Sequence, residues 1–184
     1  MKTQYSKRIM LGFLGACLLT AAGCSASKLQ NAPEAPLPAN ESSAEYIDRI
    51  AGQTTVSESD AMRGILLLLD GKDAAGSFDE RVAALKERGI VAASWDCRPQ
   101  RPLTRGKMAY MIYLACDVPG GVILTLTGPS QRYCLRELQY RGFVGQGAVY
   151  SDVPGMEFVA VLTRADSCLQ TGKVPKVLAT NEGR

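Results

Sequence analysis

The chain contains no histidine among its 184 residues. Without imidazole, Ser/His/Asp and Cys/His catalytic arrangements, a histidine general base and histidine-containing metal sites are all excluded. The cysteines give no close pair of the kind that zinc sites use, the glycines form no phosphate-binding loop, and no stretch presents two carboxylates in a catalytic setting. We therefore expect a protein that is not an enzyme and holds no metal or cofactor.

The N-terminal region has no hydrophobic run long enough to span a membrane. The apolar run over residues 9–22 has about 14 residues, whereas a spanning helix needs about 20. Three basic residues and no acidic residue precede this run: Lys2, Lys7 and Arg8. Such a layout is typical of a cleaved secretory signal peptide.

The segment Leu19–Cys24, with sequence LTAAGC, resembles the lipobox of bacterial lipoproteins. The resemblance implies a lipoprotein signal over residues 1–23 and a mature chain that begins at Cys24, which carries the lipid (palmitate). The lipobox favours Leu where Ala21 stands here. Cys17 fits that preference better, but its choice would leave a shorter apolar core over residues 9–16.

The residue after Cys24 is Ser25, whereas Asp at this place retains many lipoproteins of two-membrane bacteria in the inner membrane. By this resemblance we expect the protein in the cell envelope, anchored by its lipid in the outer membrane and facing the periplasm.

The mature chain lacks an excess of charge of either sign. Removal of the three basic residues of the signal reduces Lys plus Arg from 21 to 18, which equals the 18 Asp plus Glu. Overall charge therefore gives no reason to expect nucleic-acid binding. An electrostatic function has to come from local clusters of charge.

Four cysteines follow the anchor, in a compartment that favours oxidation. They allow two disulfides with three connectivities, or else they are buried free thiols, and the sequence does not separate these alternatives. The four are Cys97, Cys116, Cys134 and Cys168.

Composition divides the mature chain into three parts. Residues 24–44 are rich in Ala, Pro, Ser and Asn and have few large apolar side chains, which predicts a flexible tether. Residues 45–168 have the length of one folded domain. Residues 169–184 are mostly polar, and we expect them to form a loose C-terminal tail.

The domain contains an internal repeat. Segments that begin at Val56, Leu103 and Val153 align without gaps at offsets of 47 and 50 residues. Each opens with an aliphatic residue, continues with a Ser, Thr or Pro that suits the start of a helix, and then runs into mainly apolar sequence. Each segment therefore predicts a capped helix.

A second helix is predicted ahead of each repeated segment. Residues 78–91 and 132–144 both end in Arg, Gly and an apolar residue, where glycine suits the left-handed turn that closes a helix. Residues 45–52 are a shortened counterpart. The predicted fold is mainly α, with three helix-loop-helix units of about 50 residues and one short strand or extended segment over residues 122–127.

The repeat resembles the S-layer homology (SLH) domain, most clearly in the middle unit. The matching residues there are Phe78 and Asp79, then residues 89–91, then residues 103–106. The resemblance covers about residues 45–168 and implies a helical pseudo-trimer that binds cell-wall polymers through its loops and second-helix starts.

The family's Thr-Arg-Ala-Glu motif departs from its pattern in this chain. Residues 104–107 read Thr-Arg-Gly-Lys, residues 57–60 read Ser-Glu-Ser-Asp, and residues 154–157 read Pro-Gly-Met-Glu. Only the middle unit keeps the arginine.

A cluster of basic residues marks the candidate ligand site. Between residues 98 and 141 there are seven basic residues against two acidic ones, and guanidinium groups suit carboxylate and phosphate ligands. The alternative is a solvated basic surface with Arg105 paired to an internal acid and Trp95 in the core rather than against a sugar. The candidate residues are Trp95, Arg98, Arg101, Thr104, Arg105 and Lys107, with Thr104 and Arg105 at a helix N-terminus that favours anions.

These patterns predict a non-catalytic, membrane-anchored lipoprotein that binds peptidoglycan or an anionic cell-wall glycan and links the layers of the envelope. The alternative is a structural or adaptor lipoprotein that binds another envelope protein.

Overall fold

The computed structural model describes residues 41–174. The predicted signal peptide, Cys24, most of the predicted tether and the last ten residues lie outside the described residues.

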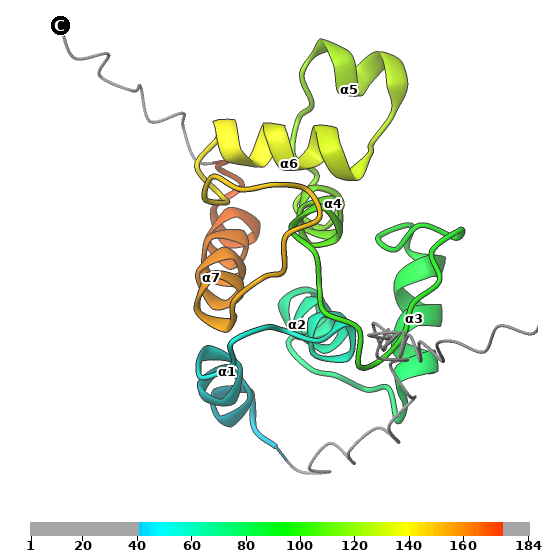
Figure 1. Ribbon diagram of the computed structural model, residues 1–184, viewed down its shortest axis with the longest axis vertical. Coiled ribbons are helices and arrows are strands. Elements are labelled where there is room, and N and C mark those ends of the chain that lie inside the picture. Colours follow the sequence, from blue (N-terminus) through cyan, green and yellow to red (C-terminus); the bar gives the residue numbers. More distant parts are fainter. Residues whose placement is uncertain (1–40, 175–184) are drawn as a thin grey trace, which may run out of the picture. The chain divides into compact units, whose positions relative to one another are not determined.

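The described part of the chain is helical and has no sheet (Figure 1). Unit one contains α1 and α2, unit two contains α3 and α4, and unit three contains α6 and α7. The short helix α5 lies in the connection between units two and three. The helices are α1 (Ser43–Ala51), α2 (Glu58–Asp70), α3 (Phe78–Glu87), α4 (Arg105–Ala115), α5 (Val122–Thr127), α6 (Gln131–Tyr140) and α7 (Gly155–Thr171).

The predicted helix starts are confirmed. The hydroxyl of Ser57 accepts a hydrogen bond from the backbone N–H of Asp60, and that of Thr104 accepts from Lys107. Pro154 occupies the same position before α7 without a side-chain hydrogen bond. The residue that caps each second helix is therefore the one expected from the repeat.

The predicted glycine turns after the first helices of units two and three are also confirmed. Gly89 and Gly142 have φ angles of +72° and +74°. Beyond them, the N–H of Ile90 donates to the carbonyl of Leu85 at 2.9 Å, and that of Phe143 donates to Leu138 at 2.8 Å. These bonds close each helix and return an apolar residue to the core.

The three residues that open the repeated segments meet at the centre of the domain. The N–H of Val56 donates to the carbonyl of Val153 at 2.9 Å, that of Leu103 to Val56 at 2.8 Å, and that of Val153 to Leu103 at 3.0 Å. All three residues are fully buried. The hydrogen bonds form a closed cycle in which each unit donates to the preceding one, so the units are related by a pseudo-threefold axis.

Helix packing follows the same cycle (Figure 1). The second helix of each unit packs on the first helix of the next: α2 on α3, α4 on α6, and α7 on α1. One continuous core results. Its largest fully buried side chains include Tyr46, Ile50, Met62, Ile65, Leu85, Leu103, Met108, Met111, Ile112, Leu135, Phe143 and Phe158.

The expectation of a strand or extended segment over residues 122–127 is wrong, because these residues form α5. The N–H of Thr125 donates to the carbonyl of Gly121, and Gly128, with a φ of +77°, ends the helix. A run of six β-branched and apolar residues suits a short helix as well as a strand, so local pattern does not separate the two.

The first and last helices extend a few residues beyond the range 45–168 that was predicted for the domain. Helix α1 begins at Ser43, because Ser42 and Glu45 form a capping box: the Ser42 hydroxyl accepts from the N–H of Glu45, and the Glu45 carboxylate accepts from that of Ser42. Helix α7 continues to Thr171, beyond the expected end at residue 168. Within residues 41–174 no helix combines the length and the apolarity that crossing a membrane requires.

Candidate functional site

The pseudo-threefold axis creates three equivalent junctions, where the start of one second helix faces the start of the next. The first helical residue of one unit lies opposite the third helical residue of the following unit. At the first junction, between units one and two, Glu58 faces Lys107, and at the second, between units two and three, Arg105 faces Glu157. At the third, between units three and one, the matching positions hold Gly155 and Asp60.

A backbone hydrogen bond joins the neighbouring units at each of the three junctions. The N–H of Glu58 donates to the carbonyl of Arg101 at 2.8 Å, that of Arg105 to Ser151 at 2.9 Å, and that of Gly155 to Gln53 at 3.0 Å. The first N–H groups of these helices are therefore already occupied by neighbouring carbonyls.

This arrangement corrects the expectation that the start of α4 offers free N–H groups to an anion. The N–H of Arg105 is bonded to Ser151, that of Gly106 to the carbonyl of Val149 at 2.8 Å, and that of Lys107 to the hydroxyl of Thr104 at 3.3 Å. Thr104 acts as a helix cap. Its hydroxyl accepts within its own helix.

A buried carboxylate organises the first junction. Glu58 is fully buried, and its Oε2 accepts from the backbone N–H of Arg98 at 2.8 Å. Its Oε1 forms an ion pair with the ammonium group of Lys107 and lies 4.0 Å from Nη1 of Arg101. A carboxylate so far from water needs such partners, so Lys107 and the loop at residue 98 are held in place by it.

The exposed edge of the first junction carries two guanidinium groups that share one carboxylate. Asp96 accepts from Nε of Arg98 at 3.1 Å and from Nη2 of Arg101 at 2.9 Å. These contacts, chiefly the hydrogen bond from Arg101, lower the pKa of Asp96. The side chain of Arg98 is 61% exposed.

Trp95 lies half-buried beside this edge. Its ring is tilted against that of Tyr110 with the centroids 5.0 Å apart, and the ammonium nitrogen of Lys107 lies 5.3 Å from the ring centroid. Trp95 is therefore not a fully buried core residue.

The second junction holds Arg105 in an internal ion pair. Nε of Arg105 lies 2.9 Å from Oε1 of Glu157, Nη2 pairs with the other carboxylate oxygen, and Nη1 donates to the hydroxyl of Ser151 at 2.7 Å. Gly147 allows this placement, since a Cβ at that position would lie 2.9 Å from Cδ of Arg105. All of the nitrogen atoms of the guanidinium group are engaged.

The third junction has no ion pair between its matching positions. Gly155 approaches unit one so closely that a Cβ would lie 1.8 Å from the carbonyl oxygen of Ile50. Asp60 accepts instead from Nη1 of Arg49 at 3.0 Å, the hydroxyl of Ser57 at 2.8 Å and the amide of Gln53 at 3.3 Å.

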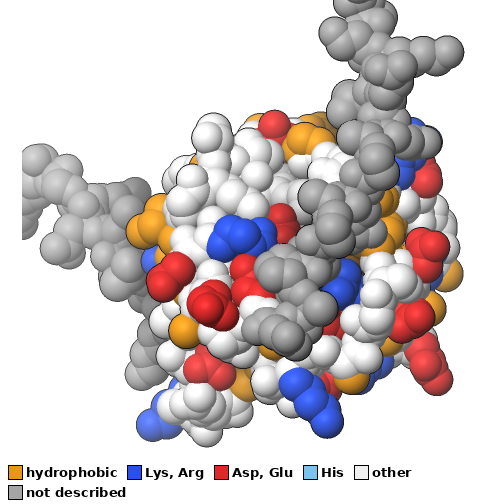
Figure 2. All heavy atoms as spheres, turned by 90° about the horizontal axis from the view of Figure 1, so that it is seen from below, with side chains coloured by type: hydrophobic (Ala, Val, Ile, Leu, Met, Phe, Trp, Pro, Cys, Tyr) orange, Lys and Arg blue, Asp and Glu red, His pale blue; other side chains and the backbone are white. Residues whose placement is uncertain are grey.

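An ion-pair network extends from the third junction along α2, and the sequence reading missed it. Glu41 binds both Arg49 and Arg63, and Asp73 binds Arg81 at 2.6 Å. The hydrogen bond from Arg49 is the main cause of the lowered pKa of Glu41. Figure 2 looks at the molecule from the end where α1 lies in Figure 1, and acidic and basic side chains lie beside one another on this face.

The structure therefore divides the six candidate residues. Four of them gather at the first junction: Trp95, Arg98, Arg101 and Lys107. Arg105 belongs to the second junction, and Thr104 caps α4. The structure agrees with the alternative in which Arg105 pairs with an internal acid, and that acid is Glu157.

Internal pairing also reduces the basic excess expected between residues 98 and 141. Nε of Arg141 binds Glu137 at 2.7 Å. Arg132 and Arg136 are exposed, and among the described residues neither forms an ion pair. The cations left unpaired thus lie on α6, away from the predicted site.

Of the two alternatives for the cysteines, the described part of the chain contains no disulfide, and all four cysteines are free thiols. Cys116, Cys134 and Cys168 are buried, and Cys97 is partly buried. Burial raises the pKa of Cys116 to about 12 and that of Cys134 to about 11. The alternative of buried thiols fits this structure.

No cluster of three or more acidic or cysteine side chains suited to a metal ion occurs within residues 41–174. Comparison with protein families, with curated proteins and with solved structures finds no match to this chain.

Proposed function

We propose that the protein is a lipoprotein of the cell envelope, anchored through acylated Cys24, whose helical domain binds cell-wall polymer and so links two layers of the envelope. The anchor rests on the signal and lipobox pattern of residues 1–24. The wall-binding role rests on the first junction.

The observation that carries the proposal is the pair of guanidinium groups of Arg98 and Arg101, which share the single exposed carboxylate of Asp96. Below them, the charge of Glu58 is balanced by Lys107. The exposed edge therefore keeps one positive charge in excess, and guanidinium groups bind carboxylates in a fixed, two-pronged geometry. Peptidoglycan stem peptides and anionic glycans both carry carboxylates.

Trp95 adds a second element suited to a polysaccharide. It lies half-buried at the same junction, with the ammonium group of Lys107 over its ring. An aromatic ring is a good surface for the apolar face of a sugar ring. A sugar against Trp95 with its carboxylate against Arg98 and Arg101 would use the whole edge of the junction.

Purified peptidoglycan sacculi test this proposal. The unacylated chain from residue 24 onward is sedimented with sacculi, and the R98A/R101A variant is compared with R88A. Arg88 is a suitable control because its guanidinium is also exposed and paired, with Asp70. We expect R98A/R101A to bind at least about tenfold more weakly, because both guanidinium groups are lost, and R88A to bind like the wild type. Wild-type protein that stays in the supernatant, or equal binding by all three, would contradict the proposal.

A second candidate function is an adaptor that binds another envelope protein. The internal pairing of Arg105 with Glu157 favours it, because the one arginine kept from the family motif is engaged within the chain. Crosslinking in cells followed by mass spectrometry distinguishes the two: one abundant protein partner supports the adaptor, and wall fragments support the linker.

The anchor has its own test. In cells supplied with an alkyne-tagged palmitate, we expect label on the wild type and on C17A but not on C24A. Label that is lost in C17A and kept in C24A would move the acylation site to Cys17.

A further inference from the structure

Helix α5 and its flanks form a projection without charge. The stretch of residues 118–131 contains no Asp, Glu, Lys or Arg. Gly121 and Gly128 bound the helix, and the main packing partner of α5 is α6. In Figure 1 it stands out beyond α6 at the top of the molecule.

Three apolar side chains of α5 are open to solvent. Val122 is 77% exposed, Ile123 54% and Leu126 79%, whereas Leu124 packs inward and is 7% exposed. Three large aliphatic side chains on a six-residue helix are costly to hydrate, and such a grouping marks a surface that meets an apolar environment.

The polar side chains of α5 need no water. The hydroxyl of Thr125 donates to the carbonyl of Gly121 at 3.3 Å, and that of Thr127 donates to the carbonyl of Ile123 at 2.8 Å. The threonine hydroxyl donors are thus used within the helix. Transfer of α5 out of water would leave none of them unsatisfied.

Basic side chains without partners lie on the adjoining helix. Arg132 and Arg136 are exposed on α6, and no ion pair of the described residues includes them. The neighbouring acid Glu137 is held by Arg141, with 2.7 Å between Nε and Oε1. The helix next to the apolar projection therefore carries two unpaired positive charges, and Asp117 is an exposed acid before α5.

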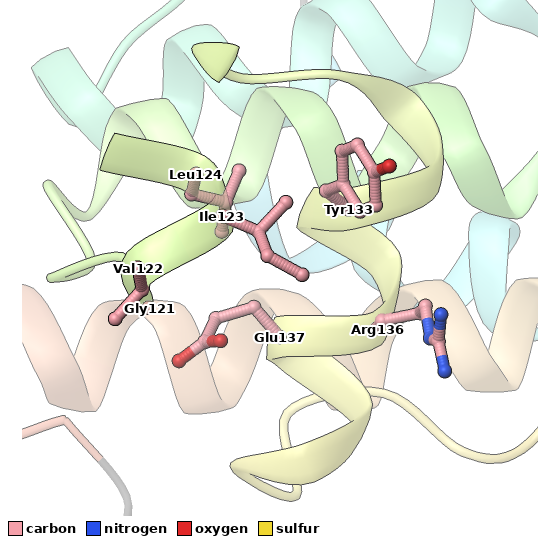
Figure 3. A pocket seen from close by; sticks show the side chains of 7 residues that line it. All are labelled: Gly121, Val122, Ile123, Leu124, Tyr133, Arg136 and Glu137. Atoms are coloured by element: carbon pink, nitrogen blue, oxygen red, sulfur yellow. The ribbon is translucent and has the colours of Figure 1, made fainter. Parts of the chain in front are cut away.

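A hollow of about 400 Å³ lies between α5 and α6. Figure 3 shows its lining, with Gly121, Val122, Ile123 and Leu124 from α5 and Tyr133, Arg136 and Glu137 from α6. In this view the guanidinium group of Arg136 points away from the aliphatic side chains of α5, so the hollow has an apolar side on α5 and a basic group at its far edge.

We propose that α5 is a membrane-docking element. Val122, Ile123 and Leu126 enter the boundary between headgroups and acyl chains of an anionic bilayer, and Arg132 and Arg136 bind lipid phosphates. Charge complementarity favours this occupant, because an uncharged apolar tip next to unpaired arginines matches the layering of an anionic membrane surface. Docking of this kind is separate from polymer binding at the first junction.

Vesicle co-sedimentation tests the proposal, with the unacylated chain from residue 24 onward. We expect binding to vesicles that contain phosphatidylglycerol and about tenfold weaker binding to phosphatidylcholine alone. V122S/L126S and R132Q/R136Q should each bind the anionic vesicles about tenfold more weakly, since one loses apolar insertion and the other phosphate contacts. Y150S is the matched control, because Tyr150 is 83% exposed and lies outside this surface.

Three results would overturn the proposal: wild-type protein that does not bind the anionic vesicles, V122S/L126S that binds them like the wild type, or Y150S that loses binding to the same degree. Sedimentation velocity without vesicles supplies a further decisive outcome. A wild-type dimer that becomes a monomer in V122S/L126S would assign the surface to a second copy of the chain and not to lipid.

Discussion

The guanidinium group of Arg105, in the first turn of α4, binds the carboxylate of Glu157, in the first turn of α7, with 2.9 Å between Nε and Oε1. The pair joins units two and three at the position where Glu58 and Lys107 join units one and two. The acidic and basic residues exchange positions between the two junctions: the first helical residue is the acid in Glu58 and the base in Arg105. The charged residues of the repeated motif therefore contribute to the contacts between units.

A double-mutant cycle on R105A and E157A should give a coupling energy of about 1 to 2 kcal/mol, because the pair is two-pronged and mostly buried. The cycle is measured by urea unfolding. The exposed pair of Arg88 and Asp70 is the control, for which we expect about 0.5 kcal/mol or less. Equal coupling energies for the two pairs would show that Arg105 does not hold the units together.

Gly155 should not tolerate a side chain. In G155A the new Cβ would meet the carbonyl oxygen of Ile50 at 1.8 Å, so α7 has to move away from unit one. We expect a loss of about 3 kcal/mol or more, or a failure to fold, measured by thermal unfolding. G145A is the control, because nothing lies within 4 Å of a Cβ there, and it should change stability by about 0.5 kcal/mol or less. A G155A variant as stable as G145A would contradict the close approach.

The four thiols should differ in reactivity. Burial raises the pKa of Cys116 to about 12, so at about pH 8 very little of this thiol is in the reactive thiolate form. Iodoacetamide labelling of the folded protein, read by mass spectrometry, should modify partly buried Cys97 first and leave Cys116 and Cys134 unmodified until the protein unfolds. Labelling of Cys116 as fast as Cys97 would contradict this order, and a disulfide-linked peptide would contradict the free thiols.

Glu41 should make the stability of the folded protein depend on pH in the acidic range. Its hydrogen bond with Arg49 lowers its pKa in the folded protein below the ordinary value of 4.5. The stabilisation is therefore complete above that ordinary value and is lost as the pH falls through the lower pKa of the folded state. As the pH falls below the ordinary value of 4.5, the wild type should lose more stability than E41Q does, as measured by urea unfolding. Parallel losses would show that Glu41 does not contribute.

The repeated units were predictable because the signals that start and end their helices are local in sequence. The residues that open each second helix, and the glycines after Arg88 and Arg141, carry their signal in a few neighbouring positions. The offsets of 47 and 50 residues then place Val56, Leu103 and Val153 in equivalent positions, and these three form the central cycle of hydrogen bonds.

The division of the candidate site was not predictable in the same way. Arg98, Arg101, Arg105 and Lys107 are close in sequence, but the side chain of Arg105 turns to a partner 52 residues away. Glu58 is fully buried although its sequence position looks like an exposed helix start. Such contacts depend on which unit follows which around the axis, and no local pattern contains this information.

The start of α1 and the helical form of α5 also differ in how far the sequence predicts them. The start of α1 was available from the sequence, since Ser42 followed by Glu45 is a capping box. The helical form of α5 was not, because six apolar and β-branched residues fit a strand or a helix equally well.

The most direct test of polymer binding at the first junction is hydrogen–deuterium exchange with solubilised cell-wall polymer. We predict slower exchange in peptides that cover residues 95–101, with no change in peptides that cover residues 147–157 at the second junction. This readout does not depend on any variant being able to fold. Exchange that is unchanged over residues 95–101, or protection confined to the second junction, would contradict the account.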